Sequence, residues 1–288
     1  MSRRIPGLPT QRVLGAYRAV LADWPTPNTR RYLPTCAGPT FVLSCGPLDA
    51  PPLVLLHGAL SNAASWMFDA RTWSSRFRVH VVDLVGEPGL SAQTQLPLTG
   101  DAWARWLDDV LDALQLASAN FVGLSLGGFL GLDYAARRPD RVDSLVLISP
   151  CGIGRQRAFF LKALPYLMLG RWGRDRLLTK VIGPRTTPPP DEARPLLNLL
   201  TLIRQEVLPR SLRIPRLSDG QLAALRMPVR LILGRRDALI NAPQAARRMR
   251  KLAPHADVSL LPDAYHDIPD LCDEVLDWLL QKPHTRPA

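Results

Sequence analysis

The chain has 288 residues, of which 47% are hydrophobic and 21% charged, and its formal net charge is +11. This length and apolar share can fill the core of one large α/β domain or two small ones. No run of about eighteen apolar residues occurs, so we expect no transmembrane helix and no integral membrane association. Because the charged first residues lead into no apolar stretch, we also expect no secretory signal and a cytoplasmic protein.

Cysteine spacing bears on metals and on redox state. The four cysteines, Cys36, Cys45, Cys151 and Cys272, lie far apart, without a C-x-x-C pair or a zinc-binding spacing. We therefore expect reduced thiols, as in a cytosolic protein, and no bound metal.

Positive charge is concentrated in residues 151–226, where fourteen Arg and Lys side chains stand against five Asp and Glu. A basic surface can attract anionic substrates, membrane surfaces or nucleic acid. It is also typical of a merely solvated face, which is the interpretation we favour. No nucleic-acid-binding motif accompanies the charge, so we expect no nucleic-acid partner.

The first elements along the chain are a helix and a hairpin. Residues 11–22 have helical periodicity, and the Trp24-Pro25 sequence ends it. Two short β-like runs follow at 31–33 and 40–44, with Ala-Gly-Pro between them. They predict a hairpin at the edge of a sheet.

Short apolar runs then alternate with helical patterns. The apolar runs cover residues 53–56, 78–82, 119–122, 144–148, 229–233 and 257–261, and the helical patterns cover 101–116, 129–138, 242–252 and 270–280. Continuous apolar runs of this length suit strands that are buried on both faces, as in a parallel sheet. The alternation predicts a doubly wound, mostly parallel α/β sheet, whose reactive groups gather beyond the carboxyl ends of the strands.

The alternation fails between about 152 and 224, a segment rich in Arg and Pro. Helical stretches are predicted there at 159–168 and 195–207. We interpret the segment as a helical cap inserted over the active site. The predicted organisation is a first core part at 1–150, a cap at 151–226 and a second core part at 227–288.

The sequence Gly123-Leu-Ser125-Leu-Gly127 is a G-x-S-x-G pattern between an apolar run and a helical run. Strand, sharp turn and helix would expose the Ser125 hydroxyl and place a helix N-terminus behind it. The pattern alone is a weak signal, because glycine and serine are common in loops. In this context it predicts that Ser125 is a catalytic nucleophile.

A serine nucleophile needs a base and an acid that orients the base. Of the five histidines, His266 follows the last apolar run and precedes the final helix, so we predict that it is the base. The acid should come between serine and histidine in chain order, at another strand end, and Asp237 fits. Asp263 and Asp267 are weaker candidates because they lie so near His266.

Acyl transfer also needs donors for the oxyanion of the tetrahedral intermediate. We predict the backbone N–H groups of Leu126, directly after the nucleophile, and of Ala59, in the loop after the apolar run at 53–56. Gly58 would let this loop bend close to the site. His57 is expected to hold the loop in shape rather than to transfer protons.

The ordered set Ser125, Asp237 and His266, with the His57-Gly58 loop upstream, resembles the α/β-hydrolase superfamily and, within it, the bacterial serine carboxylesterases. The resemblance covers nearly the whole chain. It is carried by the segments 51–60, 73–83, 123–128, 138–142 and 234–237. It implies an α/β-hydrolase sheet, a cap domain, an acyl-enzyme intermediate and no cofactor.

Two positions depart from the family pattern. Tyr265 stands where relatives often have glycine before the histidine. The turn at 84–91 contains Glu87 and is a variant of the usual small-residue turn. Asp83, just before that turn, is commonly structural in relatives, so we keep it out of the catalytic set.

The sequence therefore predicts a serine hydrolase that cleaves carboxylic esters, with a small-molecule ester or related acyl compound as substrate, acting as a monomer or a homodimer. Thioesterase, lactonase, aminopeptidase and C–C bond hydrolase activities share all the named residues and stay open. The basic segment favours acidic or phosphate-bearing acyl donors. A non-catalytic binding protein on the same fold and a peripheral membrane protein held through the basic segment are the non-enzymatic alternatives.

Overall fold

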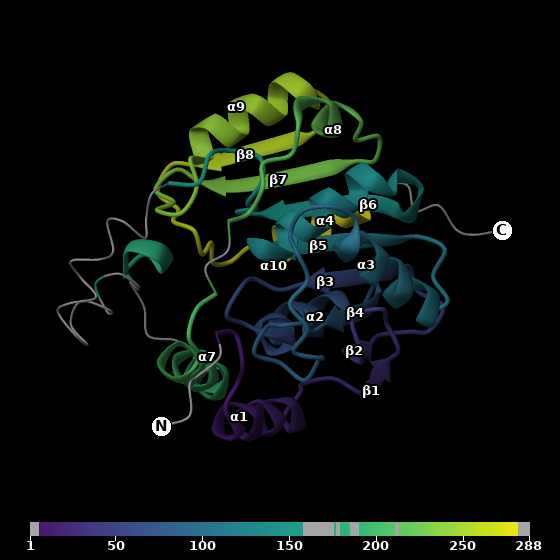
Figure 1. Ribbon diagram of the computed structural model, residues 1–288, viewed down its shortest axis with the longest axis vertical. Coiled ribbons are helices and arrows are strands. Elements are labelled where there is room, and N and C mark those ends of the chain that lie inside the picture. The colour runs from purple at the N-terminus through teal and green to yellow at the C-terminus, as the bar shows by residue number, and fades with distance from the viewer. Residues whose placement is uncertain (1–5, 158–175, 177–178, 185–189, 211–212, 282–288) are drawn as a thin grey trace.

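The computed structural model describes residues 6–157, 176, 179–184, 190–210 and 213–281. Figure 1 shows one twisted sheet with helices on both faces. The eight strands have the order β1-β2-β4-β3-β5-β6-β7-β8. Their bounds are β1 Asn28–Leu33, β2 Thr40–Cys45, β3 Pro52–Leu56, β4 Arg78–Val82, β5 Ala119–Leu124, β6 Val142–Ile148, β7 Val229–Gly234 and β8 Asp257–Leu261.

The pairing of the strands makes the sheet mostly parallel. From β4 through β3, β5, β6 and β7 to β8, every neighbouring pair is parallel. Only β2 is antiparallel to its neighbours β1 and β4, so the predicted hairpin lies at the sheet edge. The carboxyl ends of six strands therefore meet along one side of the molecule.

Helices cover the two faces of the sheet in separate groups. The helices are α1 Gln11–Ala22, α2 Met67–Trp73, α3 Ala102–Ala113, α4 Leu126–Arg137, α7 Arg194–Glu206, α8 Asp219–Ala223, α9 Ala242–Leu252 and α10 Cys272–Leu280, with 3-10 turns η1 Ala63–Trp66, η2 Pro139–Arg141 and η3 Asp191–Ala193. One apolar cluster joins the sheet to α3, α4, α8 and α9. A second joins the opposite face to α1, α2, α7 and α10.

Alternation of side chains along β3 shows how both faces are filled. Val54 and Leu56 belong to the first cluster, whereas Leu53 and Leu55 belong to the second. All four side chains are 0% exposed. A strand with two buried faces reads as an uninterrupted apolar run, which is why the sequence predicted β3 and its neighbours.

The sequence predicted most elements to within a few residues. The predicted fold class, strands and hairpin are confirmed, and the helices at 11–22 and 242–252 have the expected bounds. Two helices of the described residues, α2 and α8, and the turn η1 were not predicted. The predicted helix at 159–168 lies outside the described residues.

The inserted segment lies between β6 and β7 in the chain. Three of its described parts contact the rest of the molecule. Helix α7 packs against α1, and α8 contacts α4 and α9. Val181 O accepts a hydrogen bond from His266 N at 3.0 Å. A Cβ atom at Gly183 would lie 2.6 Å from Tyr265 Cδ2. These contacts agree with a cap, although the domain division at 151–226 stays a prediction.

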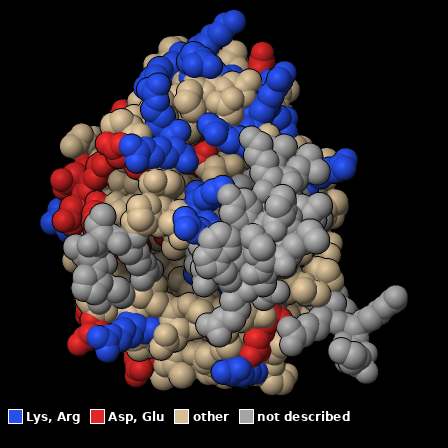
Figure 2. Space-filling view, turned by 90° about the vertical axis from the view of Figure 1, so that its left-hand side faces the viewer, with Lys and Arg blue, Asp and Glu red and all other residues tan. Residues whose placement is uncertain are grey.

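Figure 2 looks at the side toward which β7 and β8 point in Figure 1. Lys and Arg gather at the top of this view, where α9 lies. The exposed basic side chains of that helix are those of Arg247, Arg250 and Lys251. Positive charge is thus not confined to residues 151–226. Within the part of the chain that the structure describes, no helix is long and apolar enough to cross a membrane.

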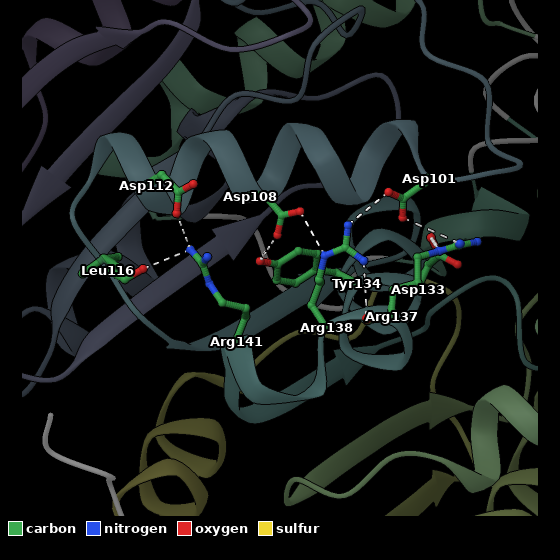
Figure 3. Close-up of polar contacts among 9 residues, drawn as sticks. All are labelled: Asp101, Asp108, Asp112, Leu116, Asp133, Tyr134, Arg137, Arg138 and Arg141. Carbon is green, nitrogen blue, oxygen red and sulfur yellow. Dashed lines mark hydrogen bonds and ion pairs between the residues drawn. The ribbon is translucent and has the colours of Figure 1, made fainter.

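A polar network ties α3 to α4 on the outside of the sheet (Figure 3). Arg138 donates from Nε to Asp108 Oδ2 and from Nη2 to Asp101 Oδ2, both at 3.0 Å. Tyr134 Oη donates to the other oxygen of Asp108 at 2.9 Å. Arg141 donates to Asp112 at 2.8 Å. The network thus holds the C-terminal half of α4 against α3, at the end of the helix away from Ser125.

Candidate active site

Ser125 lies at a sharp turn between β5 and α4, with φ 53° and ψ −106°. A positive φ is strained for a residue with a side chain, so the surroundings must hold the turn. A Cβ atom at Gly123 would lie 2.6 Å from Gly127 O, and one at Gly127 would lie 2.2 Å from Leu56 O. Neither distance is sterically allowed, which explains why glycine stands two residues before and two after the serine.

Asp237 follows β7 in a turn closed by its own N–H donating to Gly234 O at 3.2 Å. Its side chain is 0% exposed. Oδ1 accepts two backbone N–H groups, from Leu239 at 2.7 Å and from Ile240 at 3.0 Å. These two bonds fix the carboxylate and leave Oδ2 for another donor.

His266, in the loop between β8 and α10, connects Asp237 to Ser125. Its Nδ1 lies 2.7 Å from Asp237 Oδ2, and its Nε2 lies 2.9 Å from Ser125 Oγ. An ionised carboxylate can only accept, so Nδ1 carries the proton and Nε2 accepts from the serine hydroxyl. Tyr265, which stands where relatives often have glycine, prevents neither of these two hydrogen bonds. The structure therefore brings the three predicted residues into one chain of hydrogen bonds.

The loop after β3 passes close to the serine. A Cβ atom at Gly58 would lie 3.6 Å from Ser125 Cβ, and Ala59, the next residue, is exposed. Leu126 is the first residue of α4, a position whose N–H has no partner within its own helix. The two predicted oxyanion donors thus lie on backbone segments that flank Ser125.

His57 holds this loop, as expected from its position. The ring is buried, its Nδ1 donates to Gly58 O at 2.8 Å, and its Nε2 accepts from Leu84 N at 3.0 Å. Both ring nitrogens are therefore occupied by the backbone. Burial lowers the pKa of His57 to about 4, so the ring is neutral and unsuited to proton transfer with a substrate at neutral pH.

Asp83 is a buried structural carboxylate, as the resemblance implied. Oδ1 accepts from Tyr17 Oη at 2.8 Å and from Ala63 N at 2.7 Å, while Oδ2 accepts from Leu90 N at 2.7 Å. Burial raises the pKa of Asp83 to about 6, against the effect of these donors. The residue connects α1, η1 and the turn after β4, and none of these three hydrogen bonds involves Ser125 or His266.

The other histidines among the described residues, and Asp263, lie away from this chain of hydrogen bonds. His80 is buried in β4 against Ser44, at 2.8 Å between Nδ1 and Oγ. Exposed His255 bonds Met227 O at 3.2 Å. Asp263 forms an exposed ion pair with Arg236. His284 lies outside the described residues.

A cavity of about 180 Å³ lies near the turn at Ser125. Its lining includes Leu124 and Asp267, the sequence neighbours of Ser125 and His266, and two indole rings of η1 and α2. A larger hollow of about 380 Å³ lies between α1 and α7 and is lined by none of the predicted site residues. Neither hollow is lined by Ser125, Asp237 or His266 themselves, and the smaller one reaches only their sequence neighbours.

The sequence marks the turn at 84–91 as unusual but predicts no role for Glu87. The structure buries this side chain to 2% exposure beside the Gly58–Leu60 loop. Its Oε2 accepts from Leu60 N at 2.7 Å. The only sequence signal was a carboxylate in a turn where small residues are usual.

Comparison with known proteins agrees with the fold. A family model described as "alpha/beta hydrolase fold" matches residues 51–192. Carboxylesterase YbfK of Bacillus subtilis is 30% identical over 265 residues, which are 88% of this chain and 87% of the relative. Its solved structure, carboxylesterase CesB (YbfK), has a TM-score of 0.77 at 28% identity, covering 94% of this chain and 96% of that one.

A second solved structure is similar over the same extent. The naproxen esterase (carboxylesterase NP) of Bacillus subtilis has a TM-score of 0.78 at 26% identity, again covering 94% of this chain and 96% of that one. Similarity of this extent spans the sheet and the helices on both of its faces. The chain therefore belongs to the α/β-hydrolase family, and it is a carboxylesterase-like enzyme.

Proposed function

We propose that this protein hydrolyses carboxylic esters through an acyl-enzyme intermediate, with Ser125 as nucleophile, His266 as general base and Asp237 as the acid that orients it. The observation that carries the proposal is the unbroken hydrogen-bond chain from Asp237 Oδ2 through the imidazole to Ser125 Oγ. The carboxylesterase relatives support the ester as the substrate class.

The acylation step uses each member of this chain. Ser125 Oγ attacks the ester carbonyl carbon while His266 Nε2 takes the hydroxyl proton. Asp237 keeps Nδ1 protonated and stabilises the imidazolium that forms. The tetrahedral intermediate collapses, the carbon–oxygen bond to the alcohol breaks, and His266 returns its proton to the departing alkoxide.

Deacylation repeats the chemistry with water. His266 removes a proton from a water molecule that attacks the acyl carbon, and the second collapse releases the carboxylic acid and the Ser125 hydroxyl. In both halves the N–H groups of Ala59 and Leu126 stabilise the oxyanion. No step calls for a metal or an organic cofactor.

The substrate class is a small-molecule carboxylic ester or a related acyl compound. This partner class is part of the same proposal.

Covalent labelling tests the proposal. A fluorophosphonate should react with the purified protein and leave an adduct on Ser125, located by mass spectrometry, because it mimics the tetrahedral intermediate. Ser125→Ala should lose essentially all hydrolysis of aryl esters, and His266→Ala should abolish labelling while leaving the fold intact. A Ser125→Ala protein that hydrolyses aryl esters at the parental rate would refute the assignment.

A further inference from the structure

The Ala59–Leu60 peptide has an unusual anchor on the far side from Ser125. Leu60 has a positive φ of 54°, a conformation that residues with a side chain rarely adopt without support. Its N–H donates to Glu87 Oε2 at 2.7 Å. The carboxylate comes from the turn after β4, 27 residues along the chain. A tertiary contact therefore holds the strained residue that follows the predicted oxyanion donor.

Arg210 holds Glu87 in place from the inserted segment. Arg210 Nη1 lies 3.4 Å from Glu87 Oε1 and donates to Gly86 O at 3.2 Å. Both side chains are nearly buried, at 10% and 2% exposure. Burial raises the pKa of Glu87 to about 7, while the Leu60 N–H and the Arg210 charge oppose that shift. Above that pH the carboxylate offers one oxygen to each donor.

Two restraints bracket Ala59. On one side, His57 Nδ1 donates to Gly58 O, the carbonyl of the peptide that carries the Ala59 N–H. Because C=O and N–H point in opposite directions in a trans peptide, this bond directs the N–H away from His57. On the other side, Glu87 fixes the Ala59–Leu60 peptide. With a hydrogen bond on each neighbouring peptide, rotation of the Ala59 N–H is restrained from both sides.

We propose that Glu87 is a positioning residue for the oxyanion hole, holding the Ala59 N–H toward the oxyanion through its hydrogen bond to Leu60 N. The inference rests on the proposed function, since it assigns Glu87 a part in the same acyl transfer. Glu87 touches no reacting atom. Through Arg210, it also connects the inserted segment to the donor loop.

Variants at Glu87 separate positioning from mere stability. At a pH of about 8.5, Glu87→Ala should lower kcat on an aryl ester by about 10- to 100-fold, less than or near the loss on removing one donor outright. KM should change by no more than about three-fold, because the interaction acts on the transition state. Glu87→Gln keeps an oxygen acceptor for Leu60 N and should restore kcat to within about three-fold of the parent. Glu87→Asp keeps the charge but shortens the reach, so its kcat should lie between those of the Gln and Ala variants.

Asp108→Ala is the matched control. Asp108 is also a partly buried carboxylate with two donors, Tyr134 and Arg138, but it lies on α3 away from the serine. The Asp108→Ala substitution should lower the midpoint of thermal unfolding and leave kcat at the parental value. If Glu87→Ala does not fold, the Asp and Gln variants carry the same comparison.

The outcomes distinguish this inference from the proposed function. Parental kcat in folded Glu87→Ala or Glu87→Asp, with Ser125 still labelled by the fluorophosphonate, would overturn the positioning role and leave the esterase proposal standing. A Gln variant as slow as the Ala variant would also overturn it, because the acceptor would then be irrelevant. Failure of the parent protein to label at Ser125 would instead refute the proposed function itself.

Discussion

Two residues of the proposed triad, Asp237 and Ser125, are oriented by the backbone of their own turns. Asp237 shows this most clearly, because the N–H groups of Leu239 and Ile240 hold Oδ1 and thereby direct Oδ2 at the imidazole. Ser125 is oriented by a strained φ that its glycine neighbours permit. The site is thus assembled from preformed turns rather than from flexible side chains.

Removing the charge of Asp237 should cost activity without costing the fold. Asp237→Asn can still accept at Oδ1 from the turn, but its amide can donate to His266 Nδ1 and favour the wrong tautomer. We expect kcat to fall by about 10³- to 10⁴-fold, by analogy with the same change in other Ser-His-Asp enzymes. Steady-state kinetics with an aryl ester measures the loss. Asp263→Asn is the control at an exposed ion pair and should keep parental kinetics.

His80 should make stability depend on pH. The ring is buried in β4, and burial, with the nearby charges of Arg78 and Arg31, lowers its pKa from 6.5 to about 4. Between these two values the unfolded chain binds a proton that the folded protein does not, so stability falls as pH decreases from 6.5 toward 4. This one ring should contribute a loss of about 2 to 3 kcal/mol over that window.

Urea denaturation at a series of pH values checks the effect. His80→Asn keeps a partner for Ser44 but cannot titrate, so its free energy of unfolding should decline less steeply than that of the parent between pH 6.5 and 4. His255→Gln removes an exposed histidine and should leave the parental slope. Parallel slopes for parent and His80→Asn would contradict the prediction.

At the scale of elements, α4 is held at both ends by different means. Its N-terminus is fixed by the packing of Gly127 against β3, and its C-terminal half is fixed by the ion pairs to α3 (Figure 3). Arg138 is the hub of those pairs, since it joins Asp101 and Asp108. The turn at Ser125 continues directly into this helix. Loss of the contacts at the C-terminal end of α4 should therefore displace the turn only if the packing at the N-terminal end is also lost.

Arg138→Ala should therefore lower stability more than activity. It breaks two charge-assisted hydrogen bonds that are partly exposed, so the expected loss in the free energy of unfolding is about 1 to 2 kcal/mol. The value of kcat should change by less than about two-fold, because Gly127 holds the other end of the helix. Chemical denaturation and ester kinetics measure the two quantities. The control is Arg194→Ala, which breaks an exposed ion pair between Arg194 on α7 and Asp191 on η3 and should change neither the stability nor kcat. A large drop in kcat for Arg138→Ala alone would show that the turn at Ser125 depends on the α3 contact.

At the scale of the whole molecule, the fold could be predicted from the sequence because the sheet is buried on both faces. Strands such as β3 and β4 read as apolar runs whose ends could be located to within a residue or two. Those ends then indicated where polar residues such as Asp237 and Ser125 would converge, since parallel strands end on the same side. The fold and the candidate residues were therefore accessible from local patterns.

The parts that the sequence did not disclose depend on contacts between distant segments. Helix α2 and the turn η1 follow a run of small residues without clear periodicity, and their burial against the sheet, with Ala63 and Ala70 at 0% exposure, is what makes them regular. The contact between Glu87 and Leu60 N has no local signature either. Its role depends on how two loops pack, which no short pattern encodes.

The proposed triad draws its members from widely separated parts of the chain, with His266 lying 141 residues after Ser125. Translation therefore delivers the nucleophile long before its base. A nascent or prematurely terminated chain carries a serine without a proton acceptor, and such a hydroxyl is a poor nucleophile. If the proposed triad is correct, ester cleavage begins only when β8 has joined the sheet and brought His266 with it. Unfinished copies of this enzyme should accordingly be harmless to the esters around them.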